Sequence, residues 1–310
     1  MNTLREAVHD YVEMRQSLGF KLGDAKRRLL KFVSFLEECG ASHITTALAL
    51  QWAQENPSHA LGEGYQRLGY VRGFARYRSA IDPRTEIPPL GLLPKRKYRP
   101  KPYLYSDDEI RLLLNATLEM RSLRGFRGET YRCLLGLLAV TGLRISEAVN
   151  LRLEDVDLTA GVLTIRESKF RKSRYVPIHP STVEVLSRYA SQRKRFLARR
   201  STPFFFISRQ ATRLIFSCVH VTFYAISRHV GLRGPLASHG PRLHDFRHRF
   251  AVQTLMNWYR SGEDVERRLP QLSTYLGHVN PSNTYWYLTA YPELMGLAMQ
   301  RLDKRWEARI

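Results

Sequence analysis

The sequence has little cysteine and no long apolar run. Its three cysteines, Cys39, Cys133 and Cys218, are odd in number and far apart, which excludes a disulfide framework and a zinc-binding spacing and favours a reducing compartment. The longest apolar run, from Cys133 to Leu143, is too short to cross a bilayer. Charged residues stand close to the N-terminus, so we expect no signal peptide. These absences predict a soluble protein of the cytoplasm.

Acidic residues are also in short supply. The 310 residues include 28 Asp and Glu against 49 Lys and Arg, which gives a formal net charge of +21 and a pI near 10.2. This excess predicts a polyanionic partner. Because the basic residues are spread over many segments rather than along one amphipathic helix, nucleic acid is favoured over an anionic membrane.

The charge divides the chain into regions. Residues 1–87 hold twelve basic and ten acidic residues, whereas 88–103 hold five basic residues and no acidic one. The first region predicts a small helical domain, because apolar residues recur at helical spacing over 4–12 and 29–36, with further helices near 45–55 and 64–80. Prolines interleaved with basic residues over 88–103 are typical of an extended linker that lies along DNA.

A second domain is expected over 104–310. Ser106–Glu109 is a capping box with acidic residues in the first turn, which opens a helix. Apolar runs and periodicity predict three more helices, at 131–140, 181–199 and 243–258. Two short runs of β-branched and apolar residues predict strands joined by a basic turn, at 162–165 and 174–178. The fold class is therefore mainly α with a small antiparallel β-sheet.

The string Thr141–Glu147 places an arginine just after a glycine. Gly142 permits a tight turn before a helix, so Arg144 can present a planar fork to two phosphate oxygens. Glu147 follows three residues later on the same helical face and can orient that arginine. An ordinary Arg–Glu pair on a helix surface would have the same spacing.

His244 and Arg247 are three residues apart and share a helical face. One phosphate could therefore contact a proton carrier and a cation, which stabilises the negative charge that develops during attack. His248 is expected to pack or bond within its own helix. Together with His244 it imitates the His-x-x-x-His pair of a zinc metalloprotease, but the neighbouring arginine and the lack of a third ligand disfavour a metal.

His278 is followed nine residues later by Tyr287. A phenol is a nucleophile once its proton is removed or strongly hydrogen-bonded. Tyr275, Tyr285 and Tyr291 lie nearby, and only one of 285 and 287 can face a given side of a helix. We expect Tyr287 to be the reactive residue and the others to pack, with Tyr291 as the second choice.

Taken together, these strings resemble the tyrosine recombinase (phage integrase) family, most strongly from 104 to 290. The resemblance implies a helical, SAM-like core-binding domain over 1–87, a linker over 88–103 and a mixed α+β catalytic domain over 104–310. It also implies the catalytic set, with Tyr287 as the nucleophile: Arg144, Glu147, Lys169, His244, Arg247, His278 and Tyr287.

Lys169 lies in the basic turn between the two predicted strands. A lysine at a hairpin tip can protonate a leaving 5′ oxygen, and the resemblance selects Lys169, with Lys172 as the competitor. Other basic residues are expected to contact DNA: Arg67, Arg72, Arg76, Lys95, Arg96, Lys97, Arg99, Arg171, Lys172 and Arg174.

The resemblance implies a site-specific recombinase or integrase, either Xer-like or of a mobile genetic element, which cuts and rejoins DNA through a 3′-phosphotyrosyl intermediate. It implies no metal, ATP or other cofactor, and a homotetramer on paired DNA sites, alone or with sister recombinases, near the bacterial nucleoid. Residues 292–310 are expected to form a tail helix that docks on a neighbour or closes the domain. Two alternatives stay open: a type IB topoisomerase and a non-catalytic DNA-binding protein.

Overall fold

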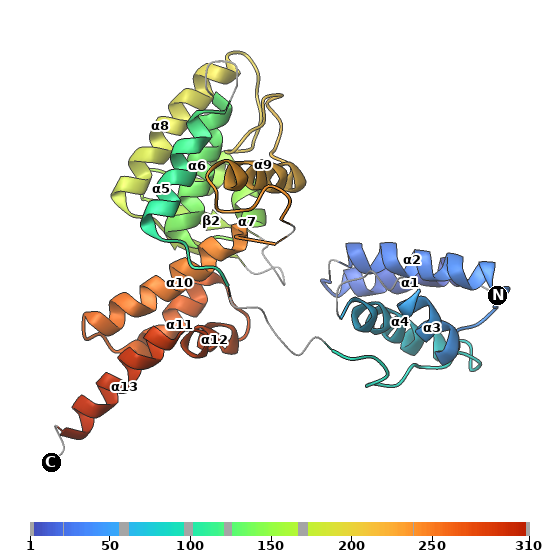
Figure 1. The fold of residues 1–310 in the computed structure, drawn as a ribbon. Coiled ribbons are helices and arrows are strands. Elements are labelled where there is room, and N and C mark those ends of the chain that lie inside the picture. Colours follow the sequence, from blue (N-terminus) through green and yellow to red (C-terminus); the bar gives the residue numbers. More distant parts are fainter. Residues whose placement is uncertain are drawn as a thin grey trace. The chain divides into compact units, whose positions relative to one another are not determined.

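The protein is mainly helical, with one small antiparallel sheet, which confirms the predicted fold class. The computed structural model describes these residues: 3–20, 22–55, 62–95, 102–120, 126–166, 173–237 and 239–307. The chain divides into two compact units, Met1–Pro100 and Lys101–Ile310. Each unit has its own apolar core (Figure 1). No helix in the described ranges is long and apolar enough to cross a membrane.

The first unit is built from helices whose apolar faces meet. They are α1 (Leu4–Ser17), α2 (Gly23–Glu38), α3 (Thr46–Gln54) and α4 (Glu63–Ser79). A capping box between Thr3 and Glu6 opens α1. Phe32, Trp52 and Phe74 are almost fully buried where α2, α3 and α4 pack together, and burial of such side chains is the main force that stabilises this unit.

The beginning of the predicted linker packs on the first unit. The guanidinium group of Arg72, on α4, donates to the carbonyl oxygens of Pro88 at 2.7 Å and Pro89 at 2.8 Å. Leu93 packs against the same apolar core. This part of the proline-rich segment is therefore held against α4, rather than being an extended spacer from residue 88 onward.

The second unit carries the remaining elements. Its helices are α5 (Asp107–Leu118), α6 (Phe126–Thr141), α7 (Ile145–Asn150), α8 (Pro180–Leu197), α9 (Phe216–His229), α10 (Leu243–Arg260), α11 (Val265–Leu276), α12 (Ser282–Ala290) and α13 (Pro292–Glu307). A 3₁₀ turn, η2 (Leu153–Asp155), precedes the strands β1 (Val156–Asp157), β2 (Val162–Ile165) and β3 (Arg174–Pro177). The strands pair in the antiparallel order β1-β2-β3, with Ile165 opposite Arg174.

Two apolar clusters organise this unit. One gathers around α6, where Leu134 and Leu138 are buried against neighbouring helices and the sheet. The other joins α10, α11, α12 and α13, which lie next to one another in Figure 1. Leu255 and Leu276 are fully buried in it. Helix α10 packs on α6 as well as on the C-terminal helices, so it bridges the two clusters, and it carries the candidate catalytic residues His244 and Arg247.

The sequence did not predict helices α9 and α11, nor the short elements η2 and β1. Helix α9 is rich in β-branched and aromatic residues, which favour strands over helices in isolation. Helix α11 contains Pro270 in its interior, where a missing N–H normally weakens a helix. Both are kept helical by tertiary packing, since Phe223 and Leu272 are buried in the two clusters.

Candidate active site

The turn between α6 and α7 positions the first arginine. Gly142 adopts a φ of +61°, and a Cβ there would lie 2.7 Å from Cδ1 of Phe250. The position therefore requires glycine both for its left-handed backbone and for its close approach to α10. Arg144 follows as the N-cap residue of α7, and 22% of its side chain remains exposed.

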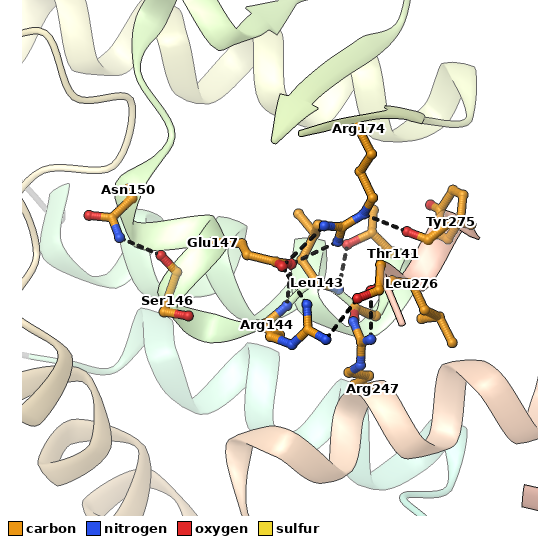
Figure 2. A network of polar contacts seen from close by, with 12 residues as sticks. Thr141, Leu143, Arg144, Ser146, Glu147, Asn150, Arg174, Arg247, Tyr275 and Leu276 are labelled. Atoms are coloured by element: carbon orange, nitrogen blue, oxygen red, sulfur yellow. Dashed lines mark hydrogen bonds and ion pairs between the residues drawn. The ribbon is translucent and has the colours of Figure 1, made fainter. Parts of the chain in front are cut away.

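Glu147 lies between two arginines. Its carboxylate accepts hydrogen bonds from Arg144 at 2.7 Å and from Arg174 at 2.8 and 3.1 Å (Figure 2). Burial raises the pKa of Glu147, but the hydrogen bonds and charges of Arg174 and Arg144 outweigh it, so the pKa lies below its ordinary value. The carboxylate is thus ionised and fixes both guanidinium groups.

The C-terminal end of α11 gathers three arginines. Gly277, at φ +68°, ends the helix in the left-handed conformation, and the last carbonyl groups of a helix have no partner within it. The carbonyl oxygens of three successive residues here accept from guanidinium groups: Tyr275 from Arg174 at 2.7 Å, Leu276 from Arg247 at 2.6 Å, and Gly277 from Arg144 at 3.1 Å. Figure 2 shows the three groups converging on this helix end.

This arrangement is electrostatically favourable because the C-terminus of a helix carries partial negative charge. It concentrates positive charge at one place before any anion arrives. Arg247 is 2% exposed and also donates to the carbonyl oxygen of Gly142 at 2.9 Å. Burial, together with the charge of Arg144, lowers the pKa of Arg247 to about 10, which leaves the group charged at neutral pH.

His278 follows directly after this helix end. Burial and the charges of Arg247 and Arg144 lower its pKa to about 3, so the imidazole is neutral at pH 7. Its Nδ1 lies 2.7 Å from the hydroxyl oxygen of Thr284, which is fully buried on α12. If the hydroxyl donates to Nδ1, the ring proton is fixed on Nε2, which becomes a hydrogen-bond donor for a phosphate.

Removing the Thr284 hydroxyl is expected to slow strand cleavage without weakening DNA binding. Thr284→Val keeps the shape but leaves the tautomer of His278 unfixed, and we expect cleavage about five- to tenfold slower, since one hydrogen bond contributes about 1 kcal/mol. Thr284→Ser retains the hydroxyl and serves as the matched control at near wild-type rate. Single-turnover cleavage of a bound DNA duplex measures both, and equal rates for the two variants would contradict this role.

Tyr287 is buried on α12, with 2% of its surface exposed. Its phenol oxygen lies 3.1 Å from Nδ1 of His248, which is 3% exposed on α10. His248 is buried, as expected of a packing residue, but its Nδ1 contacts a side chain of another helix rather than a group within α10. Nothing local in the sequence could have shown this contact between residues 39 positions apart.

His244 lies one turn before His248 and is exposed. The two imidazole rings meet edge to face, with centroids 4.7 Å apart. His244 also contributes to the low pKa of His278, so it belongs to the same cluster. Across the described ranges, no three His, Cys, Asp or Glu side chains come together in a way that could hold a metal ion.

The other tyrosines have different surroundings. Tyr285 is 51% exposed, Tyr291 is buried with its hydroxyl 3.5 Å from the carbonyl oxygen of Pro102, and the ring of Tyr275 stacks on Phe250. Of the four tyrosines, Tyr287 is the one whose charge acts on Arg247. The geometry thus favours Tyr287 as the partner of the arginine cluster.

The basic residues that were predicted to contact DNA have different surroundings in the structure. Arg67 is 7% exposed, with its guanidinium over the Trp52 ring, and Arg72 is 8% exposed, so both stabilise the first unit from inside. Arg76 and Lys95 are exposed. Arg174, predicted to contact DNA, belongs to the Glu147 network, and a basic residue at the start of a predicted strand gave no signal of that. The remaining predictions fall outside the described residues: Arg96, Lys97, Arg99, Lys169, Arg171 and Lys172.

The fold and the site together define a DNA strand-transferring enzyme. The sequence model of the phage integrase family matches residues 104–293. An integrase/recombinase of Sinorhizobium fredii, y4rB, is 56% identical over all of both chains. Tyrosine recombinase XerD of Staphylococcus aureus is 29% identical, with 93% of this chain and 94% of the relative covered.

A solved structure has the same fold. The lambda integrase tetramer bound to a Holliday junction matches with a TM-score of 0.60 and 17% identity, over 91% of this chain and 79% of that one. The chain belongs to the phage integrase family and is a site-specific DNA recombinase. These matches give no support to the topoisomerase or the non-catalytic alternative.

Proposed function

We propose that Tyr287 is the nucleophile of this recombinase and that Arg144, Arg247 and His278 bind the scissile phosphate. The observation that carries the proposal is the convergence of Arg144 and Arg247 on one helix end, beside the buried phenol of Tyr287. Two fixed cations stabilise the extra charge on the nonbridging oxygens. Each arginine spends part of its donors on carbonyl groups and keeps the others for the phosphate.

In each step of the proposed reaction, one ester bond to phosphorus breaks as another forms. The phenol oxygen of Tyr287 attacks phosphorus, the bond to the 5′ oxygen breaks, and Lys169 gives that oxygen a proton. The 5′ hydroxyl of a partner strand then attacks the 3′-phosphotyrosyl bond and releases the tyrosine. Because the bond energy is kept in the tyrosyl ester, the reaction requires no ATP, and the cations act where other enzymes use Mg²⁺.

The partner in this proposal is double-stranded DNA with a specific recombination site. The lambda integrase neighbour is a tetramer on a Holliday junction, and we propose the same assembly on paired sites here. The helical first unit and the catalytic unit would both bind DNA, with phosphate contacts from exposed groups that include Arg76 and Lys95. The protein would act at the nucleoid, in the cytoplasm of a bacterium.

Covalent trapping tests the proposed function. Nicked duplexes tiled across the DNA that flanks the gene release a short 5′-hydroxyl fragment after cleavage, so the adduct cannot reverse. With wild-type protein in EDTA, we expect an SDS-stable protein–DNA adduct whose tryptic peptide carries the nucleotide on Tyr287. An adduct mapped to another tyrosine, or one that forms only with added metal, would contradict the proposal.

A further inference from the structure

His248 has a place in the site that the arginine and histidine motifs do not explain. It lies on α10 one turn after His244 and one residue after Arg247, yet it is 3% exposed whereas His244 is exposed. The rings of His248 and Tyr287 meet edge to face, with centroids 5.5 Å apart and planes at 61°. In this geometry the Nδ1 atom reaches the phenol oxygen at 3.1 Å.

The chemistry requires a proton acceptor at the phenol. Tyrosine has a pKa near about 10 and is a weak nucleophile while protonated. A general base must lie within about 2.6–3.2 Å of the proton it removes, and Nδ1 of His248 meets that condition before DNA binds. An imidazole is suited to the task, since its ordinary pKa near about 6.5 leaves it largely neutral at physiological pH.

The other two histidines of the site, His278 and His244, are less well placed to accept the proton of the phenol. Nδ1 of His278 is engaged with Thr284, and its ring lies nearly parallel to that of Tyr287, with centroids 6.4 Å apart. His244 is on the exposed side of α10, where a phosphate can approach. The two histidines of this helix therefore have different surroundings. His244 lies on the side that DNA can reach, whereas His248 contacts the nucleophile Tyr287.

We propose that His248 is a further catalytic residue, which accepts the hydroxyl proton of Tyr287 through Nδ1 as the phenol oxygen attacks phosphorus. The inference rests on the proposed function of Tyr287. As the bond from phosphorus to the tyrosine oxygen forms, the bond to the 5′ oxygen breaks, and that oxygen takes its proton from Lys169. In strand joining, the attacking 5′ hydroxyl returns its proton to Lys169, and the imidazolium of His248 returns its proton to the tyrosine oxygen as the phosphotyrosyl bond breaks.

The fold holds this pair together through a shared core. Helices α10 and α12 pack in one apolar cluster that includes Leu255 and Tyr287. The buried charge of Arg247 next to Tyr287 favours the phenolate that proton transfer creates.

The first test compares adduct formation by wild type and His248→Asn on the nicked duplex. Asparagine places a hydrogen-bonding atom near the position of Nδ1 but does not take up a proton at neutral pH. We expect single-turnover adduct formation about 100-fold slower, the lower range for loss of a general base, with DNA affinity and thermal unfolding midpoint unchanged. His229→Asn, which changes a histidine on the surface of α9, is the matched control at wild-type rate.

The second test separates proton transfer from packing. A fluorinated tyrosine incorporated at position 287 has a more acidic phenol and depends less on a base. In His248→Asn, the fluorinated tyrosine should make adduct formation about tenfold faster, whereas the wild-type rate should change little. A purely structural defect would not respond to the acidity of the phenol.

The outcomes are distinguishable. If His248→Asn forms adduct at the wild-type rate or faster, the histidine is not the base, and a faster rate would mean that it restrains the tyrosine. If the variant is slow but indifferent to fluorination, its role is only structural, and the inference fails. If wild-type protein forms no adduct on any of the tiled duplexes, the proposed function itself fails and takes this inference with it.

Discussion

Tyr287→Phe is expected to abolish the covalent adduct while leaving DNA affinity within about twofold of wild type. The change removes the one oxygen of this side chain that can form the phosphotyrosyl bond, so we expect no residual adduct at position 287. The arginines that we propose to bind the phosphate donate to Glu147 and to carbonyl groups, not to the phenol. SDS-gel analysis of trapped complexes and a binding titration measure the two quantities on the same nicked duplex.

The neighbouring tyrosines supply the controls for that result. Tyr285→Phe changes an exposed residue, and Tyr291→Phe removes a hydroxyl whose partner is a backbone carbonyl, so both should form adduct at near wild-type rate. A persistent adduct in Tyr287→Phe that disappears in Tyr291→Phe would move the nucleophile to position 291. Loss of folding is checked by the thermal unfolding midpoint, which should differ little among the three variants.

Glu147→Gln is expected to combine a large loss of stability with a large loss of rate. The carboxylate is 8% exposed and binds both Arg144 and Arg174. Removing one member of a buried ionic group costs about 3–5 kcal/mol, because the remaining charges lose their compensation. The amide of glutamine can accept from one arginine but turns donors toward the other. Adduct formation should fall about 100-fold as Arg144 loses its orientation.

The pH dependence of this variant has a definite sign. The folded-state pKa of Glu147 lies below its ordinary value, so the carboxylate stabilises the fold fully above about pH 4.3 and progressively less as the pH falls through the folded pKa. The difference in free energy of unfolding between wild type and Glu147→Gln should therefore shrink below about pH 4. Urea unfolding at neutral and acid pH measures it.

Glu154→Gln is the matched control for this comparison. The Glu154 side chain is 62% exposed, and its contacts with Arg152 and Arg166 are at 4.0 Å. Exposed ion pairs contribute at most about 1 kcal/mol, so this variant should retain nearly wild-type stability at every pH. If the two variants lost equal stability, the buried network would not have the importance that its geometry indicates.

The sequence predicted those parts of the site that lie within a few residues of each other. Arg144 with Glu147 and His244 with Arg247 share helical faces at a spacing of three, and periodicity is the signal that sequence reasoning reads best. The mainly helical fold class and the small antiparallel sheet were also predicted from local patterns. These are features that a segment largely specifies by itself.

The missing parts of the site depend on distant pairs. Arg174 reaches the carbonyl oxygen of Tyr275 across 101 positions, and His248 reaches Tyr287 across 39. No spacing rule connects such residues, because their proximity arises when β3 packs on α11 and when α10 packs on α12. Likewise, the burial of Arg67 and Arg72 depends on where α3 and the proline segment meet α4, so their basic character suggested a surface role.

The convergence of three arginines on the end of α11 has a consequence for engineering the enzyme. The acceptors are main-chain carbonyl groups at positions 275, 276 and 277, which every amino acid possesses. The placement of the cations therefore depends on the helix terminus, on Gly277 and on the Glu147 carboxylate, and not on the side chains at 275 and 276. Sequence libraries that vary position 275 can reshape the surroundings of the phosphate while the arginines stay in register. A library that varies position 277 would lose active members, since a Cβ there would lie 2.7 Å from the Arg174 guanidinium.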